Sequence, residues 1–394
     1  MSAITIIGQG PAALLAASFI QEVQQDCVIV ADSEGSLPLW SGSFDFHAPS
    51  DDISNPWSLL DRQPLMLPAE TWAFLWESLV GFERAAGIPV AADIPSHNWW
   101  TITCTGKSKS VFVVPQWQYV QKTFLPVWFI GFQGLADSMA DFQCHTYQQQ
   151  TGVDAGFHVL PNPTPWTPSW GPIRWASYMD TDEGLSWLLS EIQKVAPEIP
   201  KTWPILLPQV IGRRRAEHNL QALTTALGQM VFEYPLVTPS LGGMRIRDRW
   251  VWYLKKQGVP FLTGRAISVE KGWVTLADGR QWHSDHVIVA TGGILGGGLE
   301  VMVDGRLRDP LRDTVVGRMP PGRAIDLYSW GQPADYGTPE MTACGSQCGG
   351  WDPNQDGNGG AMILATVWQS LCRTGIFSNL GSCNSERSVT HVGK

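Results

Sequence analysis

A loop of small residues near the N-terminus, residues 8–13, has the spacing of a phosphate-binding turn. A buried apolar run precedes it, and an alanine-rich stretch opened by Pro11 follows, which predicts a strand, a tight turn and a helix. Gly8 and Gly10 let main-chain N–H groups and the positive end of the helix approach a pyrophosphate. Ala13 stands where only close helix–strand packing is required. The loop therefore predicts a bound dinucleotide.

A carboxylate stands at the matching distance along the chain. Asp32 follows a second buried run, residues 28–30, nineteen positions after Ala13. At the end of a second strand, a carboxylate can accept hydrogen bonds from the hydroxyls of an adenosine ribose. The pair of motifs therefore favours FAD as the cofactor.

Two glycine-rich segments near the C-terminus extend this site. The run 287–290 leads into residues 291–293, a strand end that recurs at the second crossing of dinucleotide-binding flavoproteins. A third segment, residues 345–350, continues to Gly359-Gly360 before an expected helix at 359–373. That helix would bring a positive N-terminus toward a flavin ring. The predicted cofactor-binding residues are Gly8, Gly10, Pro11, Ala12, Ala13, Asp32, Ser41, Gly42, Ser43, Thr291, Gly292, Gly293, Gly345, Gly359 and Gly360.

Catalytic acids and bases are not compulsory in a flavoprotein, because the cofactor carries the redox chemistry. The catalytic residues stay unassigned, and Arg308 and Asp352 are the candidates for a place near the flavin or a phosphate. Each is equally well explained as a member of a loop-stabilising ion pair.

Composition excludes several classes of protein. The net charge of -9 argues against a nucleic-acid binder, and the run 213–215 of three arginines is read as a solvated turn. The seven cysteines form no CxxC pair and no zinc spacing, so no metal site is expected. No apolar stretch approaches the ~20 residues that span a bilayer, and no signal peptide is recognisable, which favours the cytoplasm.

The pattern of apolar residues predicts an α/β fold with a Rossmann-like FAD-binding domain that is discontinuous in sequence. Residues 1–55 and 238–378 would form that domain, with a helix at 244–257 and then a β-meander of four runs ending at 287–290. Residues 56–237 would form an inserted α/β domain, with strands near 127–130 and 205–207 and helices near 183–195 and 217–229. Residues 379–394 are expected to be a flexible tail.

These motifs together resemble the flavoproteins with two dinucleotide-binding domains, and more closely the B-subunit family of bacterial anaerobic glycerol-3-phosphate dehydrogenase. The stretches that carry the closer likeness are 41–45, 130–142, 242–246, Asp309-Pro310 and 344–353. They occur in order along nearly the whole chain. The tryptophan-rich stretch 161–175 has no counterpart in that pattern.

The resemblance implies a flavin-binding electron-transfer subunit of a membrane-associated complex. Its partners would be a catalytic flavoprotein subunit and an iron–sulfur subunit that anchors the complex to the inner face of the cell membrane. The complex would oxidise sn-glycerol 3-phosphate to dihydroxyacetone phosphate and pass electrons to quinone. The family is associated with FMN in this component, so FMN is the alternative to FAD.

Two other functions stay open from the sequence. The chain could be a self-sufficient FAD-dependent oxidoreductase of a small amine, hydroxy acid or thiol, although it shows no recognisable acid–base pair. It could also be a scaffold subunit that kept the fold and lost the cofactor. The presence of a flavin separates the scaffold from the other two, and turnover by the isolated chain separates those.

Overall fold

A five-stranded parallel sheet forms the base of the molecule in a computed structural model that describes residues 4–46, 67–91, 99–163, 170–294, 296–318, 326–327, 340–348 and 358–377. Its strands are β1 (Ile4–Ile7), β2 (Cys27–Ala31), β12 (Phe261–Thr263), β16 (His286–Val289) and β21 (Met341–Ala343). They lie in the order β12-β2-β1-β16-β21, and every neighbouring pair is parallel. The strand order therefore reverses between β1, whose connection leads to β2 on one side, and β16, whose connection leads to β21 on the other.

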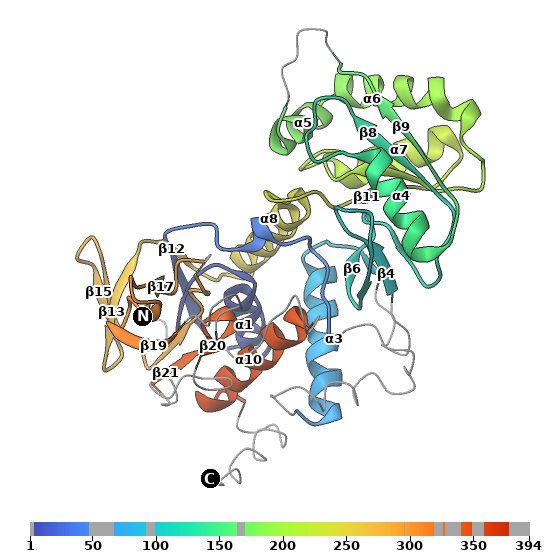
Figure 1. The fold of residues 1–394 in the computed structure, drawn as a ribbon. Coiled ribbons are helices and arrows are strands. Elements are labelled where there is room, and N and C mark those ends of the chain that lie inside the picture. The colour runs from blue at the N-terminus through green and yellow to red at the C-terminus, as the bar shows by residue number, and fades with distance from the viewer. Residues whose placement is uncertain are drawn as a thin grey trace.

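The helices α1 (Pro11–Glu22), α3 (Ala69–Ala85), α8 (Leu241–Lys256) and α10 (Gly359–Arg373) cluster beside this sheet (Figure 1). α1 contacts the other three and is buried over most of its length. Its alanines allow this close packing, and Pro11 is pre-set for a first helical position. α1 is thus held firmly, with its N-terminus at the end of β1.

A second parallel sheet lies apart from the first, at the upper right of Figure 1. Its strands are β8 (Val127–Phe132), β9 (Ala155–Leu160), β10 (Ile205–Pro208) and β11 (Val231–Tyr234), in the order β11-β10-β8-β9. The connecting helices are α4 (Ala140–Thr151), α5 (Pro172–Met179), α6 (Asp182–Val195) and α7 (Ala216–Leu227). One hydrophobic core cluster includes residues of both sheets and of α8.

Short antiparallel sheets complete the described fold. The largest are the meander β13 (Ala266–Glu270), β14 (Trp273–Leu276) and β15 (Gln281–His283), and the sheet β17 (Glu300–Val301), β18 (Arg306–Asp309), β19 (Thr314–Arg318) and β20 (Asp326–Leu327). The others are β3 (Val90–Ala91) with β6 (Val114–Pro115), and β4 (Trp99–Ile102) with β5 (Ser108–Val111) and β7 (Val120–Gln121). Short 3₁₀ turns occur at η1 (Leu37–Leu39), η2 (Ala196–Glu198) and η4 (Gly345–Gln347).

The predicted α/β fold is confirmed, and the structure shows that it contains two parallel sheets, with differences from the prediction in detail. The meander has three strands and not four, because the last run is β16, which pairs with β1 and β21 and has a fully buried Val287–Val289 segment. α8 begins at Leu241, three residues earlier than expected, because the Ser240 hydroxyl accepts the Gly243 N–H at 3.2 Å and caps the helix.

The proposed division into domains at residues 55 and 238 stays a prediction. α3 falls within the predicted insertion, yet it packs against α1, and its Phe82 ring lies 4.9 Å from that of Trp250 on α8. Residues 379–394 lie outside the described residues.

Candidate cofactor site

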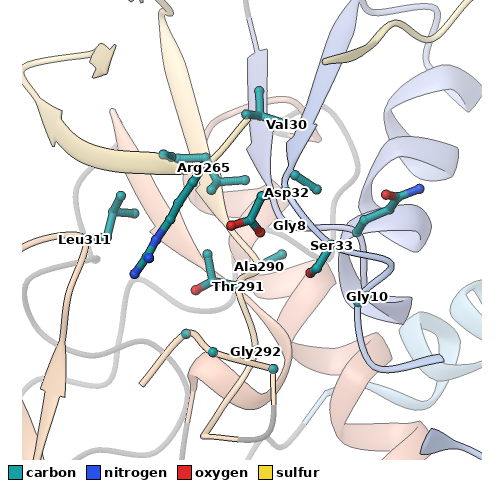
Figure 2. A pocket seen from close by; sticks show the side chains of 18 of the residues that line it. Gly8, Gly10, Val30, Asp32, Ser33, Arg265, Ala290, Thr291, Gly292 and Leu311 are labelled. Carbon is teal, nitrogen blue, oxygen red and sulfur yellow. The ribbon is translucent and has the colours of Figure 1, made fainter. Parts of the chain in front are cut away.

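A cavity of about 580 Å³ opens at the carboxyl ends of β1, β2, β12 and β16 (Figure 2). It is the place where the strand order reverses, which is the usual ligand crevice of an open parallel sheet. Five predicted cofactor-binding residues line it, namely Gly8, Gly10, Asp32, Thr291 and Gly292. Segments from both ends of the chain thus meet in one site.

Gly8 holds three strand ends together. Its N–H donates to the carbonyl of Val30 at 2.8 Å, and its φ of +123° is a conformation that side chains rarely adopt. A Cβ at this position would lie 2.2 Å from the carbonyl oxygen of Ala290. Because the loop passes directly against the end of β16, only glycine fits at this position.

The N-terminus of α1 faces this cavity without a side-chain cap. Gly10 is the N-cap residue, in an extended conformation, and no side-chain hydrogen bond caps the helix among the described residues. A Cβ on Gly10 would stand 3.4 Å from the Ser36 hydroxyl, and one on Gly35 would stand 2.6 Å from the Gln9 carbonyl carbon. The first amides of a helix have no partner within it, so this glycine cradle can bind an anion such as a pyrophosphate.

Asp32 supplies a carboxylate in the same cavity. It follows β2 directly, its side chain is exposed, and Figure 2 shows it between the glycine loop and Arg265. A carboxylate is an acceptor only, so it suits the hydroxyl pair of a ribose and disfavours a phosphate at the same place.

A buried chain of hydrogen bonds fixes the opposite wall. The Thr291 hydroxyl donates to Gln347 Oε1 at 3.1 Å, and Gln347 Nε2 donates to Asp309 Oδ2 at 3.4 Å. Asp309 Oδ1 accepts the N–H of Leu311 at 2.8 Å. This chain connects β16, β18 and η4, and it sets the positions of Thr291 and Leu311 beside the cavity.

The predicted turn Ser41-Gly42-Ser43 does not line the cavity. The Ser41 and Ser43 hydroxyls lie 3.1 Å apart, and Gln118 donates to the carbonyl of Ser41. Gly42 has a φ of +94°, and a Cβ there would lie 2.8 Å from Ile246 Cδ1 of α8. In the structure this turn contacts α8 and Gln118, which lies between β6 and β7. Its role with a cofactor stays a prediction.

The predicted C-terminal glycines also have internal contacts. Gly345, with a φ of +69°, packs on Ala12, where a Cβ would lie 2.7 Å from the Ala12 Cβ. The Gly360 N–H donates to Asp45 Oδ1 at 2.9 Å, and the other carboxylate oxygen of Asp45 pairs with Lys109 Nζ at 2.8 Å. Asp45 therefore caps α10, the helix that was expected to point at a flavin ring.

The remaining predicted positions lie outside the cavity lining. Pro11, Ala12 and Ala13 form the first turn of α1, Gly359 opens α10, and a Cβ on Gly293 would lie 3.5 Å from Ser346. Arg308 is on β18 and pairs with Asp313 at 2.7 Å and Glu300 at 3.1 Å, which fits a loop-stabilising ion pair. Asp352 lies outside the described residues.

Several lining residues were not predicted. They come from the loop after Asp32 (Ser33, Gly35 and Ser36), the connection 264–267, the glycines 296–298 and Pro310-Leu311. The glycine triplet was a usable signal, since it follows Gly292-Gly293 closely. Within the described ranges there is no cluster of three or more metal-ligating side chains. Among the described helices, none has the length and apolar character to span a bilayer.

The reversed strand order, the glycine cradle at α1 and the carboxylate at the end of β2 place a ligand crevice at the edge of an open parallel α/β sheet. No protein-family model matches the chain. It is 22% identical over 425 residues to the B-subunit of anaerobic glycerol-3-phosphate dehydrogenase from Vibrio vulnificus, covering 94% of this chain and 95% of that protein. To the probable B-subunit of the same enzyme from Halobacterium salinarum it is 24% identical over 359 residues, covering 84% and 81%.

Among solved structures, an open flavocytochrome c3 fumarate reductase matches with a TM-score of 0.33 at 8% identity. That match covers 74% of this chain and 34% of the reductase. The resemblance to the B-subunit family expected from the motifs is confirmed as a distant similarity over most of the chain.

Proposed function

We propose that the chain binds FAD in this cavity and acts as the flavin-binding, electron-transfer subunit of a dehydrogenase complex. The observation that carries the proposal is the cavity itself, in which an uncapped helix N-terminus, two glycines and Asp32 converge where the strand order reverses. The cradle suits a pyrophosphate, and Asp32 suits an adenosine ribose.

The choice of FAD over FMN rests on Asp32. FMN has no adenosine, so a carboxylate at the end of β2 would have no adenosine ribose to bind, and it would repel a phosphate placed beside it. When bound, a flavin supplies reversible two-electron and one-electron transfer, and the protein orients it and adjusts its potential. FMN is the alternative cofactor, and extraction of the bound flavin distinguishes the two.

The role as a relay component rests on the relatives. They are named as one subunit of a larger enzyme, which implies an assembly of several chains, and the similarity covers most of this chain. The partners we propose are a catalytic flavoprotein subunit and an iron–sulfur subunit that anchors the complex at the cytoplasmic face of the membrane. The complex would convert sn-glycerol 3-phosphate to dihydroxyacetone phosphate and deliver the electrons to quinone.

The chemistry of the cavity supports this division of roles. Among its described lining residues, Asp32 and Arg265 are the ionisable ones, and no histidine or second carboxylate accompanies them. An acid–base pair for dehydrogenating an alcohol would need a group with a suitable pKa near the reacting carbon. This cavity therefore supplies cofactor contacts, and we propose, from the naming of the relatives as one subunit, that the substrate binds to a partner subunit.

The test is to purify the chain, record its visible spectrum, and identify the extracted flavin by mass. We expect FAD, and we expect Asp32→Ala to weaken FAD binding about tenfold, because it removes a charge-assisted hydrogen bond. Glu270→Ala, an exposed carboxylate on β13, serves as the control for loss of charge. Turnover by the isolated chain would instead support a self-sufficient oxidoreductase, and failure to bind any flavin would support a scaffold.

A further inference from the structure

Arg265 is the one cationic side chain among the described residues that line the cavity. Figure 2 shows it extending from the connection between β12 and β13 toward Leu311 and Thr291. No ion pair joins it to Asp32 or to any other carboxylate in the described part of the chain. Other arginines of this region, such as Arg280 and Arg308, each have a carboxylate partner.

The backbone holds Arg265 in this place from both sides. The N–H of Gly264 donates to the carbonyl of Ala31 at 3.0 Å, and the carbonyl of Arg265 accepts the N–H of Ala277 at 2.8 Å. The first bond anchors the connection to the end of β2, and the second anchors it to the turn after β14. The side chain of Arg265 is therefore attached to a backbone that is already held in place. This lowers the conformational entropy that is lost when Arg265 contacts a ligand.

The surroundings of Arg265 suit a flat, aromatic group. Ala266 and Ile267 follow it in the chain, and Pro310 and Leu311 also line the cavity, so the lining offers apolar surface as well as the guanidinium. A guanidinium is planar and stacks on aromatic rings more readily than an ammonium does. A nucleobase between the apolar residues and the guanidinium would pack against the former and stack on the latter.

The order of groups along the cavity identifies that aromatic group. A pyrophosphate at the N-terminus of α1 and a ribose at Asp32 direct the rest of an adenosine toward residues 264–267 and Leu311. We propose that Arg265 stacks on the adenine of the cofactor and makes the cavity select FAD over FMN. This inference rests on the proposed function, since it concerns the adenosine half of the same ligand.

The experiment measures the affinity of the flavin-free chain for FAD, FMN, NADH and ADP by titration. Arg265→Ala should weaken FAD and ADP binding by about 3- to 30-fold and leave FMN binding unchanged, because FMN has no adenine to stack. NADH carries the same ADP group, and we expect it to bind more weakly than FAD. Arg306→Ala, which removes an exposed arginine paired with Asp304 away from the cavity, should change none of these affinities.

Arg265→Lys keeps the positive charge without the planar group, so its affinity for FAD should stay within about threefold of that of Arg265→Ala. Full recovery by lysine, an equal loss of FAD and FMN binding, or no loss in Arg265→Ala would each overturn the assignment of Arg265 while leaving a flavin site in place. Failure of the unaltered chain to bind either flavin would instead reject the proposed function. A thermal unfolding curve of each variant verifies that it is folded.

Discussion

The two parallel sheets share an architecture and differ in what stands at the place where the strand order reverses. In the first sheet that place is the cavity between β1 and β16, with glycines and an uncapped helix. In the second sheet the order reverses between β8 and β10, and the loop after β10 again leads into a helix, α7. There the protein's own side chains fill the corresponding position.

In the loop after β10, the backbone amides donate hydrogen bonds to the side chain of Asp180. Its carboxylate accepts the N–H groups of Arg213, Arg214 and Arg215, at 3.2, 3.0 and 3.0 Å. Gly212 allows the approach, since its φ is +104° and a Cβ there would lie 2.6 Å from Asp180 Oδ1. The arginine run, expected to be a solvated turn, thus presents its backbone to an internal anion. A helix start of this kind holds a ligand only where the chain does not supply the anion itself.

A buried ion pair lies beside the same loop of the second sheet. Arg245 of α8 is 3% exposed and Glu233 at β11 is fully buried, and the guanidinium donates to both carboxylate oxygens and to the carbonyl of Gly212. Removal of either partner lowers the stability of the fold strongly, because the remaining charge is then buried in a medium of low polarity without a counter-charge. At the second sheet, charged side chains of the protein itself therefore bind the loop where the strand order reverses. At the first sheet, the corresponding place is a cavity.

The largest effect is expected from breaking this pair. Arg245→Met should lower the free energy of unfolding by about 4 kcal/mol, since it leaves Glu233 charged and unpaired. Chemical denaturation measures the change, and Arg247→Met on the same helix, whose nearest carboxylates are 3.4 and 3.7 Å away, is the control with an effect below about 1 kcal/mol. Adding Glu233→Gln should recover part of the loss, and strictly additive effects would contradict the coupling.

The open crevice depends on Gly8. Gly8→Ala should destabilise the chain by about 3 kcal/mol and abolish FAD binding, because the new methyl group would collide with the Ala290 carbonyl at a positive φ. Gly152→Ala, with a φ of +69° and no atom within 4 Å of the added Cβ, isolates the conformational cost at about 1 kcal/mol. Equal effects of the two substitutions, measured by thermal unfolding and by FAD titration, would show that the close approach does not matter.

Removing Asp180 should convert the closed loop into an open anion cradle. Asp180→Ala should cost about 2 kcal/mol, because three amides lose their acceptor. Millimolar phosphate should then raise the melting temperature of this variant and leave that of the unaltered chain almost unchanged. If phosphate stabilises both chains equally, Asp180 does not take the place of an external anion.

The local motifs of the cavity were predictable from the sequence. The residues that distant parts of the chain bring to the cavity and to the start of α10 were not. Gly8 and Asp32 directly follow β1 and β2, and Thr291 comes two residues after β16, so their place at a sheet edge follows from the chain order. Arg265 and Leu311 reach the cavity only because β12 pairs with β2 and because Asp309 fixes the Leu311 backbone. The cap on α10 joins Asp45 to Gly360 across 315 positions, a distance over which no local pattern carries information.

The smallest expected effect concerns Glu83 of α3, a helix beside the first sheet whose side chains contact α8. Burial raises the pKa of Glu83 to about 8, outweighing the opposite effect of the Trp250 Nε1 donor at 3.2 Å. The folded chain binds this proton more tightly than the unfolded chain, so the stabilisation is complete below about pH 4.5 and is lost as the pH rises through about 8.

Unfolding free energies at pH 7 and pH 8 measure this effect. The unaltered chain should lose about 1 kcal/mol of stability over that interval, and Glu83→Gln, which stays neutral and can still accept from Trp250, should lose almost none of it. Glu77→Gln, at an exposed position of the same helix, should retain the slope of the unaltered chain. A slope that survives in Glu83→Gln would mean that Glu83 is charged in the folded protein, and that the contact between α3 and α8 tolerates a buried negative charge.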